Sequence, residues 1–127
     1  MTAHSILGNT RRADISFWPS GKIDIASRVV RALRMEPGDV IDIMAAGGEY
    51  YLYVAARASQ LCGRHEAQCF PSKHGSRHFR AYSRRLCSVI LRESGASSLA
   101  ALPAGDLTEV AGRPAIPVIT RNNLHHD

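Results

Sequence analysis

The amino-acid sequence predicts a single domain over residues 1–127 that is mainly β with two short helices, an α+β fold. Short runs in which apolar and polar residues alternate predict strands with one buried face. Two longer segments, each introduced by a serine, carry apolar residues at helical spacing. Glycines and prolines separate these segments and predict turns between them. A chain of 127 residues can bury roughly two-thirds of its unfolded surface in one core.

The first strands are predicted just after residues 1–12, which show no stable period and which we expect to be a mobile arm. In residues 15–17 and again in residues 22–25, isoleucine or phenylalanine alternates with a polar residue, as in a half-buried strand. The Pro-Ser-Gly sequence at 19–21 interrupts the two runs and predicts a turn or bulge.

A short basic helix is predicted from Arg28 to Met35. Ser27 is a good N-cap for it, because a serine hydroxyl can accept a hydrogen bond from an unpaired amide of the first turn. The apolar residues form one stripe, and arginines occupy the remaining surface. Pro37 and Gly38 end the helix, since proline restricts the residue before it and glycine tolerates a left-handed turn.

A hairpin is predicted after this helix. Residues 40–43 resume a strand, residues 45–48 form the connection, and residues 50–54 have the β-branched and aromatic composition of the returning strand. Residues 14–56 are therefore a strand–helix–hairpin half. The half cannot cover its own apolar faces, so we expect it to interlock with a second copy.

Residues 57–77 are predicted to be a basic loop, because they show no sustained hydrophobic period and contain glycine and proline. Between Arg57 and Arg85, seven Arg or Lys residues stand against Glu66 alone, a local charge of +6 in a chain of net charge +5. Such a patch can bind polyanions by releasing their counterions. A solvated loop that keeps the protein soluble is the alternative. We expect this loop to bury little apolar surface and to be the least ordered internal segment.

Residues 78–124 follow the same order of elements and form a second strand–helix–hairpin half. Ser83 precedes a helix that ends at Gly95, and strand segments and a turn follow it. Ser27-Arg28 matches Ser83-Arg84, and Gly38-Asp39 matches Gly105-Asp106. Either the second half is a degenerate copy, so that one chain builds the interlocked unit, or it is an unrelated extension and two chains exchange hairpins.

The first half resembles the swapped-hairpin domain of the AbrB, MazE and SpoVT proteins. The resemblance covers about a third of the chain and is carried by Gly21-Lys22-Ile23-Asp24-Ile25, Arg31, Leu33, Met35, Gly38-Asp39 and Ile41-Asp42-Ile43. It implies an interlocked double-split β-barrel, usually a homodimer. It also implies DNA binding through basic residues on and beside the short helices, in transcription regulators or toxin-neutralising proteins. The sequence departs from the family pattern at Ala26, where the family has proline, and at Arg34, where it has glycine.

The DNA contacts that follow from the resemblance and from the local charge are all basic residues. They are Lys22, Arg28, Arg31, Arg77, Arg80, Arg84 and Arg85. Residues 15–54 alone have a charge of −1, which favours a second hypothesis, an accessory protein that binds an acidic protein partner.

A zinc site is the alternative reading of the basic loop. Cys62, His65, Cys69 and His74 could supply two thiolates and two imidazoles to a tetrahedral ion. Their order matches no common zinc finger, which usually begins with two cysteines, so we expect no bound metal and no cofactor. Three cysteines are also too few and too odd in number for a disulfide framework, which indicates reduced thiols in the cytoplasm.

Enzyme activity is not predicted. The sequence has no nucleophile elbow and no phosphate-binding glycine loop, and its carboxylates are scattered. Tyr51 and Tyr53 share a strand face and could stack on bases, although packing against the neighbouring strand is the simpler reading. The longest apolar run, residues 50–56, is far shorter than the roughly 20 residues that span a bilayer.

Overall fold

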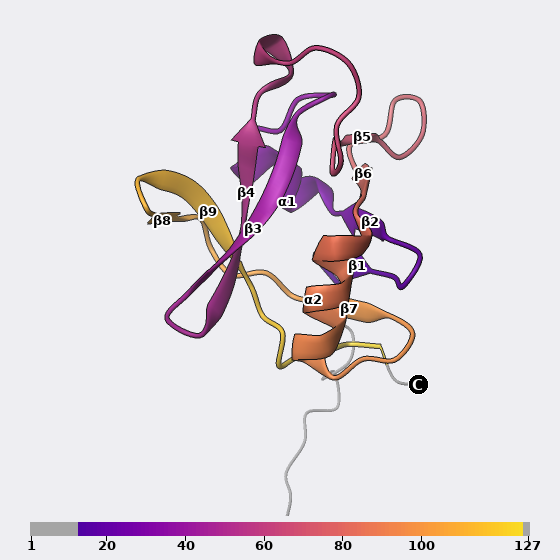
Figure 1. Ribbon diagram of the computed structural model, residues 1–127, viewed down its shortest axis with the longest axis vertical. Helices are drawn as coiled ribbons and strands as arrows, with labels where there is room; N and C mark the ends of the chain where they lie inside the picture. The colour runs from indigo at the N-terminus through magenta and orange to yellow at the C-terminus, as the bar shows by residue number, and fades with distance from the viewer. Residues whose placement is uncertain (1–12, 126–127) are drawn as a thin grey trace, which may run out of the picture.

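The structure is a computed structural model that describes residues 13–125, and it contains two antiparallel sheets and two α-helices (Figure 1). The predicted mainly β fold with two helices is confirmed. Residues 1–12, predicted to be a mobile arm, lie outside the described residues.

The elements follow one another in the expected order. The first half contains β1 (Ile15–Phe17), β2 (Lys22–Ile25), α1 (Ser27–Ala32), β3 (Val40–Ala46) and β4 (Glu49–Ala56). The second part contains a 3₁₀ turn η1 (Ala58–Gln60), β5 (Phe70–Pro71), β6 (Phe79–Tyr82), α2 (Arg84–Ser94), β7 (Ala100–Leu102), β8 (Thr108–Val110) and β9 (Arg113–Val118). The first sheet has the strand order β5-β6-β2-β1-β7, and the second has the order β3-β4-β9-β8.

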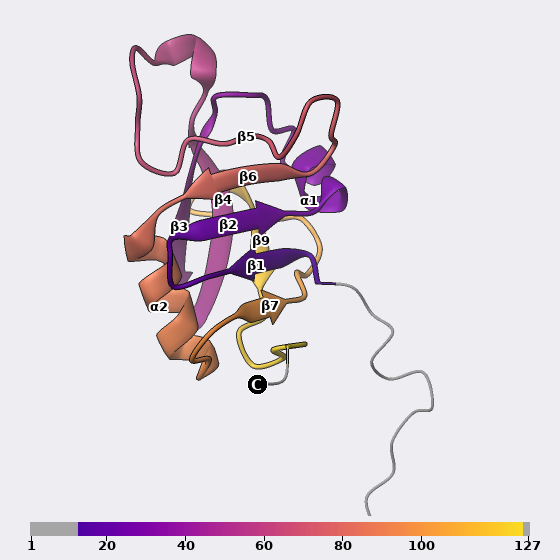
Figure 2. The ribbon, with the colours of Figure 1, turned by 90° about the vertical axis from the view of Figure 1, so that its right-hand side faces the viewer.

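The core lies between the two sheets, whose strands run across one another in Figure 2. Inward-facing residues of the first sheet, such as Ile15 and Ile23, and of the second sheet, such as Leu52 and Ile116, are fully buried. The alternation of apolar and polar residues decides which face is inward, because successive side chains of a strand point to opposite sides. The helices sit at opposite ends of the β2–β6 pair, α1 where β2 ends and α2 where β6 ends (Figure 2).

The pair β2–β6 joins the two halves at the centre of the first sheet. The strands are antiparallel, and Asp24 lies directly opposite Arg80. Along the sequence, Ser27-Arg28 follows Asp24 by as many residues as Ser83-Arg84 follows Arg80. Asp24 and Arg80 therefore occupy equivalent positions in the two halves, on an approximate twofold axis that relates β2–α1 to β6–α2.

The pair β4–β9 joins the same two halves in the second sheet. Each of these strands is the returning strand of a hairpin, and the two-residue turns at 47–48 and 111–112 all have left-handed φ angles between 52° and 79°. Leu52 follows Gly48 by as many residues as Ile116 follows Gly112, and Leu52 lies directly opposite Ile116. The twofold relation thus holds in both sheets, and each half is built into both.

The expected match between Gly38-Asp39 and Gly105-Asp106 is wrong. Gly38 has a left-handed φ of 91° and Asp39 is buried, whereas Gly105 has no such angle and Asp106 is exposed. Asp39 is held there because its carboxylate accepts hydrogen bonds from the backbone amides of Glu36 and Ala58, each at 2.8 Å.

The helix caps also differ from the expectation. Ser27 is the first residue of α1 and the N-cap is Ala26, which supplies no side-chain hydrogen bond. The amide of Ser27 instead donates to His78 Nδ1 at 3.1 Å. Ser83 does cap α2, since its hydroxyl accepts from the amide of Leu86 at 3.1 Å.

The basic loop, residues 57–77, is packed against the first half, contrary to the expectation that it would bury little. Ala67 and Cys69 belong to the core. The amide of Gly38 donates to the carbonyl of Cys69 at 2.7 Å, and the amide of Ile41 donates to the carbonyl of Ala67 at 3.0 Å. The sequence lacks a hydrophobic period here because backbone pairing with the segment after α1, rather than an apolar face, holds the loop.

Candidate nucleic-acid interface

The outer face of the first sheet is the candidate site. Along β2 and β6 the inward residues are buried, while the alternate residues face outward. Lys22 lies opposite Tyr82, Asp24 opposite Arg80, and Arg80 also opposite Phe70 of β5. Directly opposite residues of an antiparallel pair share a face, so these side chains are neighbours on one surface.

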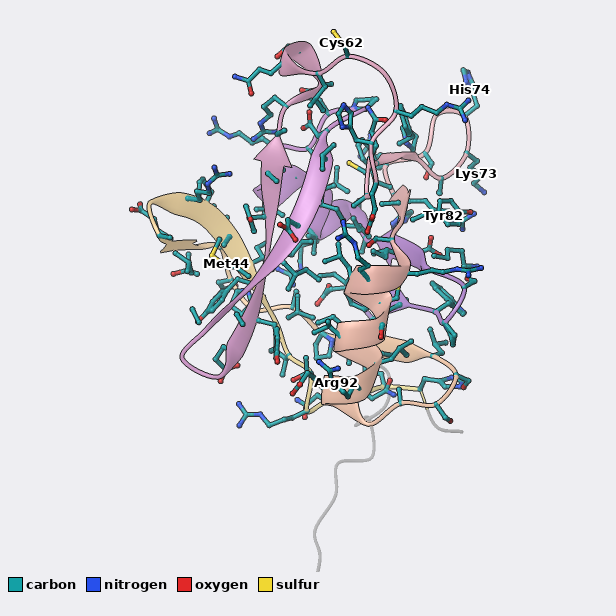
Figure 3. The ribbon with its side chains drawn as sticks, viewed as in Figure 1. Met44, Cys62, Lys73, His74, Tyr82 and Arg92 are labelled. Carbon is teal, nitrogen blue, oxygen red and sulfur yellow. The ribbon has the colours of Figure 1, made fainter. Side chains whose placement is uncertain are left out.

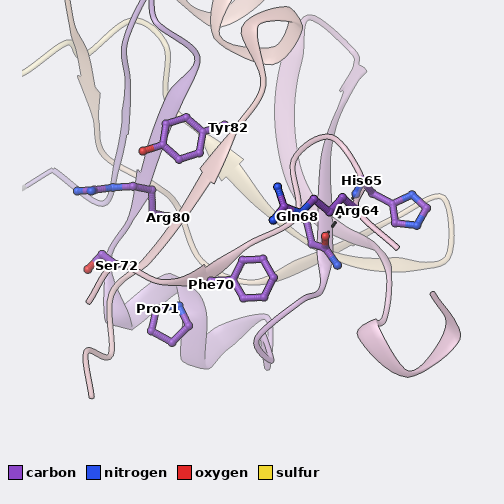
Figure 4. Close-up of a pocket in the computed structure, with 8 residues that line it drawn as sticks. All are labelled: Arg64, His65, Gln68, Phe70, Pro71, Ser72, Arg80 and Tyr82. Atoms are coloured by element: carbon purple, nitrogen blue, oxygen red, sulfur yellow. Dashed lines mark hydrogen bonds between the residues drawn. The ribbon is translucent and has the colours of Figure 1, made fainter. Parts of the chain in front are cut away.

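Two aromatic rings stand out on this face. Phe70 is 50% exposed and Tyr82 is 59% exposed, whereas the other phenylalanines of the described chain are buried. Both rings line a shallow cavity of about 510 Å³ that also touches Arg64, His65 and Arg80 (Figure 4). The remaining lining residues are Gln68, Pro71 and Ser72. The cavity therefore combines flat apolar surfaces with cationic groups.

The predicted DNA contacts are divided between the two ends of the first sheet. Arg28 and Arg31 belong to α1, and Arg84 and Arg85 belong to α2 at the opposite end (Figure 2). Lys22, Arg80 and Arg84 lie on or beside the outer face, as the stem of Arg84 packs over Gly21 in the β1–β2 turn. The structure thus brings part of the predicted set together and leaves Arg28 and Arg31 apart from it.

Three of the predicted arginines are already paired with carboxylates. Arg28 donates to Asp14, Arg80 Nε donates to Asp24 at 2.7 Å, and Arg85 Nε donates to Glu66 at 3.0 Å. Each of these hydrogen bonds is the main reason that the pKa of the arginine is raised. The paired guanidiniums attract a polyanion less than free ones do, because an adjacent carboxylate cancels much of their field.

Several cations of the described chain keep their charge available. Within residues 13–125, the side chains of Arg64, Arg77 and Arg84 make no hydrogen bond or ion pair with another described residue. Lys22 Nζ lies 4.1 Å from the centroid of the Trp18 ring, a cation–π contact that leaves its positive charge uncancelled.

The four residues of the zinc alternative do not converge. Cys69 is buried and its thiol donates to the carbonyl of Asp39 at 3.1 Å, and burial raises the pKa of this thiol to about 12. Cys62 and His74 project from different loops into solvent (Figure 3). His65 Nε2 shares a hydrogen bond of 2.9 Å with the carbonyl of Cys62. No group of three potential ligands that could hold a metal occurs in the described part of the chain.

Two of the three tyrosines of β4, Tyr50 and Tyr53, have structural partners. Tyr53 donates its hydroxyl to Asp42 at 3.2 Å, and the guanidinium of Arg113 lies 5.4 Å from the centre of its ring. Tyr50 packs against the core. Neither ring is exposed to the degree of Tyr82.

Sequence reasoning missed Phe70, Tyr82 and Arg64 as site residues. Tyr82 could have been found, because the alternation of residues 79–82 places it on the polar face of a strand. Phe70 belongs to a strand of two residues, which is too short to show a period. Its placement depends on pairing with β6, a contact that no local pattern indicates.

Comparison with known proteins finds no similar family model, no similar curated protein and no similar solved structure. Neither α1 nor α2 is long and apolar enough to cross a membrane, and the same holds for every other helical segment within residues 13–125. The chemistry of the outer face is therefore the best guide to the function of the protein.

Proposed function

We propose that the protein is a small, non-enzymatic nucleic-acid-binding protein of AbrB-like type, a transcription regulator or antitoxin-like protein. The observation that carries this proposal is the joint presence of exposed rings and unpaired cations on the outer face of the first sheet. Cations hold phosphates by counterion release, and aromatic faces stack on bases. Few other ligands present both a flat ring and a regularly spaced negative charge.

The AbrB-like architecture is supported by how the halves interlock. β2 pairs with β6 and β4 pairs with β9, so that each half completes the sheets of the other. The resemblance to swapped-hairpin domains implies that two copies of such a half interlock. The twofold relation within one chain supports the hypothesis that the second half is a degenerate copy of the first. In that case one chain covers its own apolar faces, and a homodimer is unnecessary for folding. The homodimer stays a prediction.

The test is titration of fluorescently labelled oligonucleotides, both duplex and single-stranded, followed by anisotropy at low salt. We expect binding that weakens steeply between about 50 and 200 mM salt, since released counterions drive it. Replacing Arg64 and Arg84 by glutamine should lower the magnitude of the salt slope by about 2, one for each phosphate contact. Arg92→Gln is the matched control, because this exposed arginine lies towards the far end of α2 (Figure 3).

Absence of any binding tighter than about 10⁻⁴ M at low salt would reject the proposal, because even non-specific complexes reach that affinity. An equal loss of binding in the Arg92→Gln variant would also count against the outer face, since it would show that only the net charge matters.

A second candidate is a protein-interaction role, favoured by a small groove between β3 and α2. The groove has a volume of about 140 Å³ and is lined mainly by apolar residues, among them Ile43, Leu86 and Val89. β3 is an edge strand of the second sheet. A pull-down partner that is acidic and persists after nuclease treatment would favour this candidate over nucleic-acid binding.

A further inference from the structure

Phe70 and Tyr82 are unusual because half or more of each side chain is exposed. Apolar rings of this size normally contribute to the core, as Phe17 and Phe79 do here. Both rings instead lie on the exposed side of the first sheet, where Phe70 pairs with Arg80 and Tyr82 is two residues further along the same strand. Residues placed diagonally in this way are about 7–8 Å apart on one face, which is within reach of consecutive bases.

The equivalent positions of the first half carry no rings. Ser16 lies opposite Asp24 just as Phe70 lies opposite Arg80, and Ala26 follows Asp24 just as Tyr82 follows Arg80. The fold therefore does not need aromatic residues at these positions. Their presence in one half alone indicates a ligand that contacts that half.

The charges around the rings complement a phosphate backbone. Four cationic side chains lie on or beside this face, and they are Lys22, Arg64, Arg80 and Arg84. Asp24 and Asp14 also line this face, where Asp24 pairs with Arg80 and Asp14 pairs with Arg28. Lys22 lies opposite Tyr82, Arg64 lines the cavity together with both rings, and Arg84 lies against the β1–β2 turn. Phosphates next to a stacked base would therefore meet positive charge.

We infer that the outer face binds single-stranded nucleic acid, with bases stacked on Phe70 and Tyr82 and phosphates held by Lys22, Arg64 and Arg84. The inference rests on the proposed function and narrows its ligand. Bases in a duplex are stacked on one another and offer only their edges, whereas the faces of unpaired bases are free for aromatic side chains. Stacking on rings of a sheet is tolerant of base identity, so we expect little sequence preference.

Trp18 provides a local signal for this binding. Trp18 is the single tryptophan of the chain, and Lys22 lies over the Trp18 ring. Lys22 is also the residue opposite Tyr82. A strand that displaces or contacts Lys22 should change the fluorescence of Trp18. The change should saturate together with the anisotropy of the labelled strand.

The experiment compares four probes on the full chain: oligo(dT), oligo(rU), a mixed-sequence duplex of the same length, and polyglutamate. We expect either single strand to bind at least about tenfold more tightly than the duplex, and polyglutamate to bind weakly because it has no rings to stack. The ratio of oligo(rU) to oligo(dT) distinguishes RNA from DNA, since only RNA offers a 2′-hydroxyl.

The variants test the rings directly. Phe70→Ala and Tyr82→Ala should each weaken single-strand binding about 5- to 150-fold and leave duplex binding nearly unchanged. Tyr82→Phe should keep the affinity, because the ring and not the hydroxyl is used. Leu107→Ala is the control, since Leu107 is 49% exposed but lies outside this face. Unchanged thermal unfolding should accompany all four variants.

Three contrary outcomes can be told apart. Equal binding of duplex and single strand that does not respond to ring removal would overturn the inference and leave the proposed function standing. No binding of any oligonucleotide would overturn both. Polyglutamate binding as tight as oligo(dT) would show an unspecific polyanion surface and reject the stacking role of the rings.

Discussion

Equivalent outward positions of the two halves carry different chemistry. In the first half, Ser16 lies opposite Asp24; in the second, Phe70 lies opposite Arg80. The first pair is small and acidic, while the second is aromatic and basic. Because the backbone pairing is the same, the fold does not dictate these side chains, and their difference points to a task performed by one half.

Equivalent inward positions remain apolar in both halves. Ile23 corresponds to Phe79, and Ile25 corresponds to Ala81. Across the sheet, the large Phe79 lies opposite Ile25, and the small Ala81 lies opposite Ile23. All four are buried in the same core. Close packing limits the combined volume at these sites, so the halves could diverge freely only on the surface.

The largest expected effect comes from separating the halves. A fragment that ends at Ala56 keeps the β1–β2 and β3–β4 pairs but loses β6 and β9, the strands of the second half that pair with β2 and β4. We expect it to be unfolded or dimeric, because its apolar faces have no other cover. Sedimentation and circular dichroism of the fragment would decide, and a stable β-rich monomer would contradict the interlocked description.

The position of Asp24 on the approximate twofold axis allows a more specific test with the same fragment. In a fragment dimer built on the same twofold axis, Asp24 would face Asp24 of its partner instead of Arg80. Like charges directly opposite one another destabilise a strand pair. We therefore expect Asp24→Asn to strengthen dimerisation of the fragment, and Glu49→Gln, which also removes one carboxylate but at the far end of the hairpin, to leave it unchanged.

The next effect concerns Asp39, which the second half does not reproduce. Its carboxylate is 1% exposed and accepts hydrogen bonds from two backbone amides and from Arg57, each at 2.8 Å. Asp39→Ala should lower the free energy of unfolding by about 1.5–3 kcal/mol, because two part-buried amides lose a charged acceptor. The partly exposed Arg57 contributes little of this.

Asp106→Ala is the matched control for Asp39, since Asp106 is exposed and its loss should change stability by less than about 0.5 kcal/mol. Urea unfolding of both variants measures the difference. Equal effects of the two substitutions would mean that the buried carboxylate of Asp39 contributes no more to stability than an exposed one.

A smaller effect is expected from the Asp24–Arg80 pair on the axis. Their side chains are 34% and 35% exposed, so solvent screens the attraction and a coupling energy of about 0.2–1 kcal/mol is expected. A double-mutant cycle with Asp24→Ala and Arg80→Ala measures it. The charge reversal Asp24→Arg with Arg80→Asp should restore stability, while either reversal alone places like charges opposite one another. Failure of the double reversal to recover stability would argue against the symmetric placement.

Much of this fold could be predicted from local patterns. The alternation of residues 15–17 and 22–25 found β1 and β2, and Ser83 was correctly predicted to stand directly before α2, which it caps. The errors arise where long-range contacts override local preference. Ser27 has the right side chain for a cap, but the helix begins one residue earlier and its amide is held by His78, which lies 51 residues further on.

The candidate site was harder to predict than the fold. The charge count located the basic segment, and Lys22, Arg80 and Arg84 do lie on or beside the outer face. A count of charges, however, cannot show that Arg80 is paired with Asp24. Phe70 reaches the face only through a two-residue strand within a loop, and such a strand leaves no periodic signal.

The smallest effect compares the two helix starts through pH. The cap of α2 is supported from the basic loop, because the Ser83 hydroxyl donates to Glu66 at 2.6 Å and Arg85 pairs with the same carboxylate. The start of α1 has no side-chain cap. The hydrogen bonds that Glu66 accepts at the start of α2, chiefly the one from Arg85 and then the one from Ser83, lower the pKa of Glu66 from its ordinary value of 4.5.

The sign of the pH dependence follows from this lowered pKa. Folding favours the charged carboxylate, so its stabilising effect is fully present above pH 4.5 and is lost as the pH falls through the lower pKa of the folded protein. In acid, the start of α2 should loosen before that of α1, and the amide signal of Leu86 in NMR spectra should report it. Glu66→Gln removes the titrating group and keeps a hydrogen-bond acceptor. If the wild-type protein and this variant lose stability in parallel below pH 4.5, the link between the basic loop and α2 is not electrostatic.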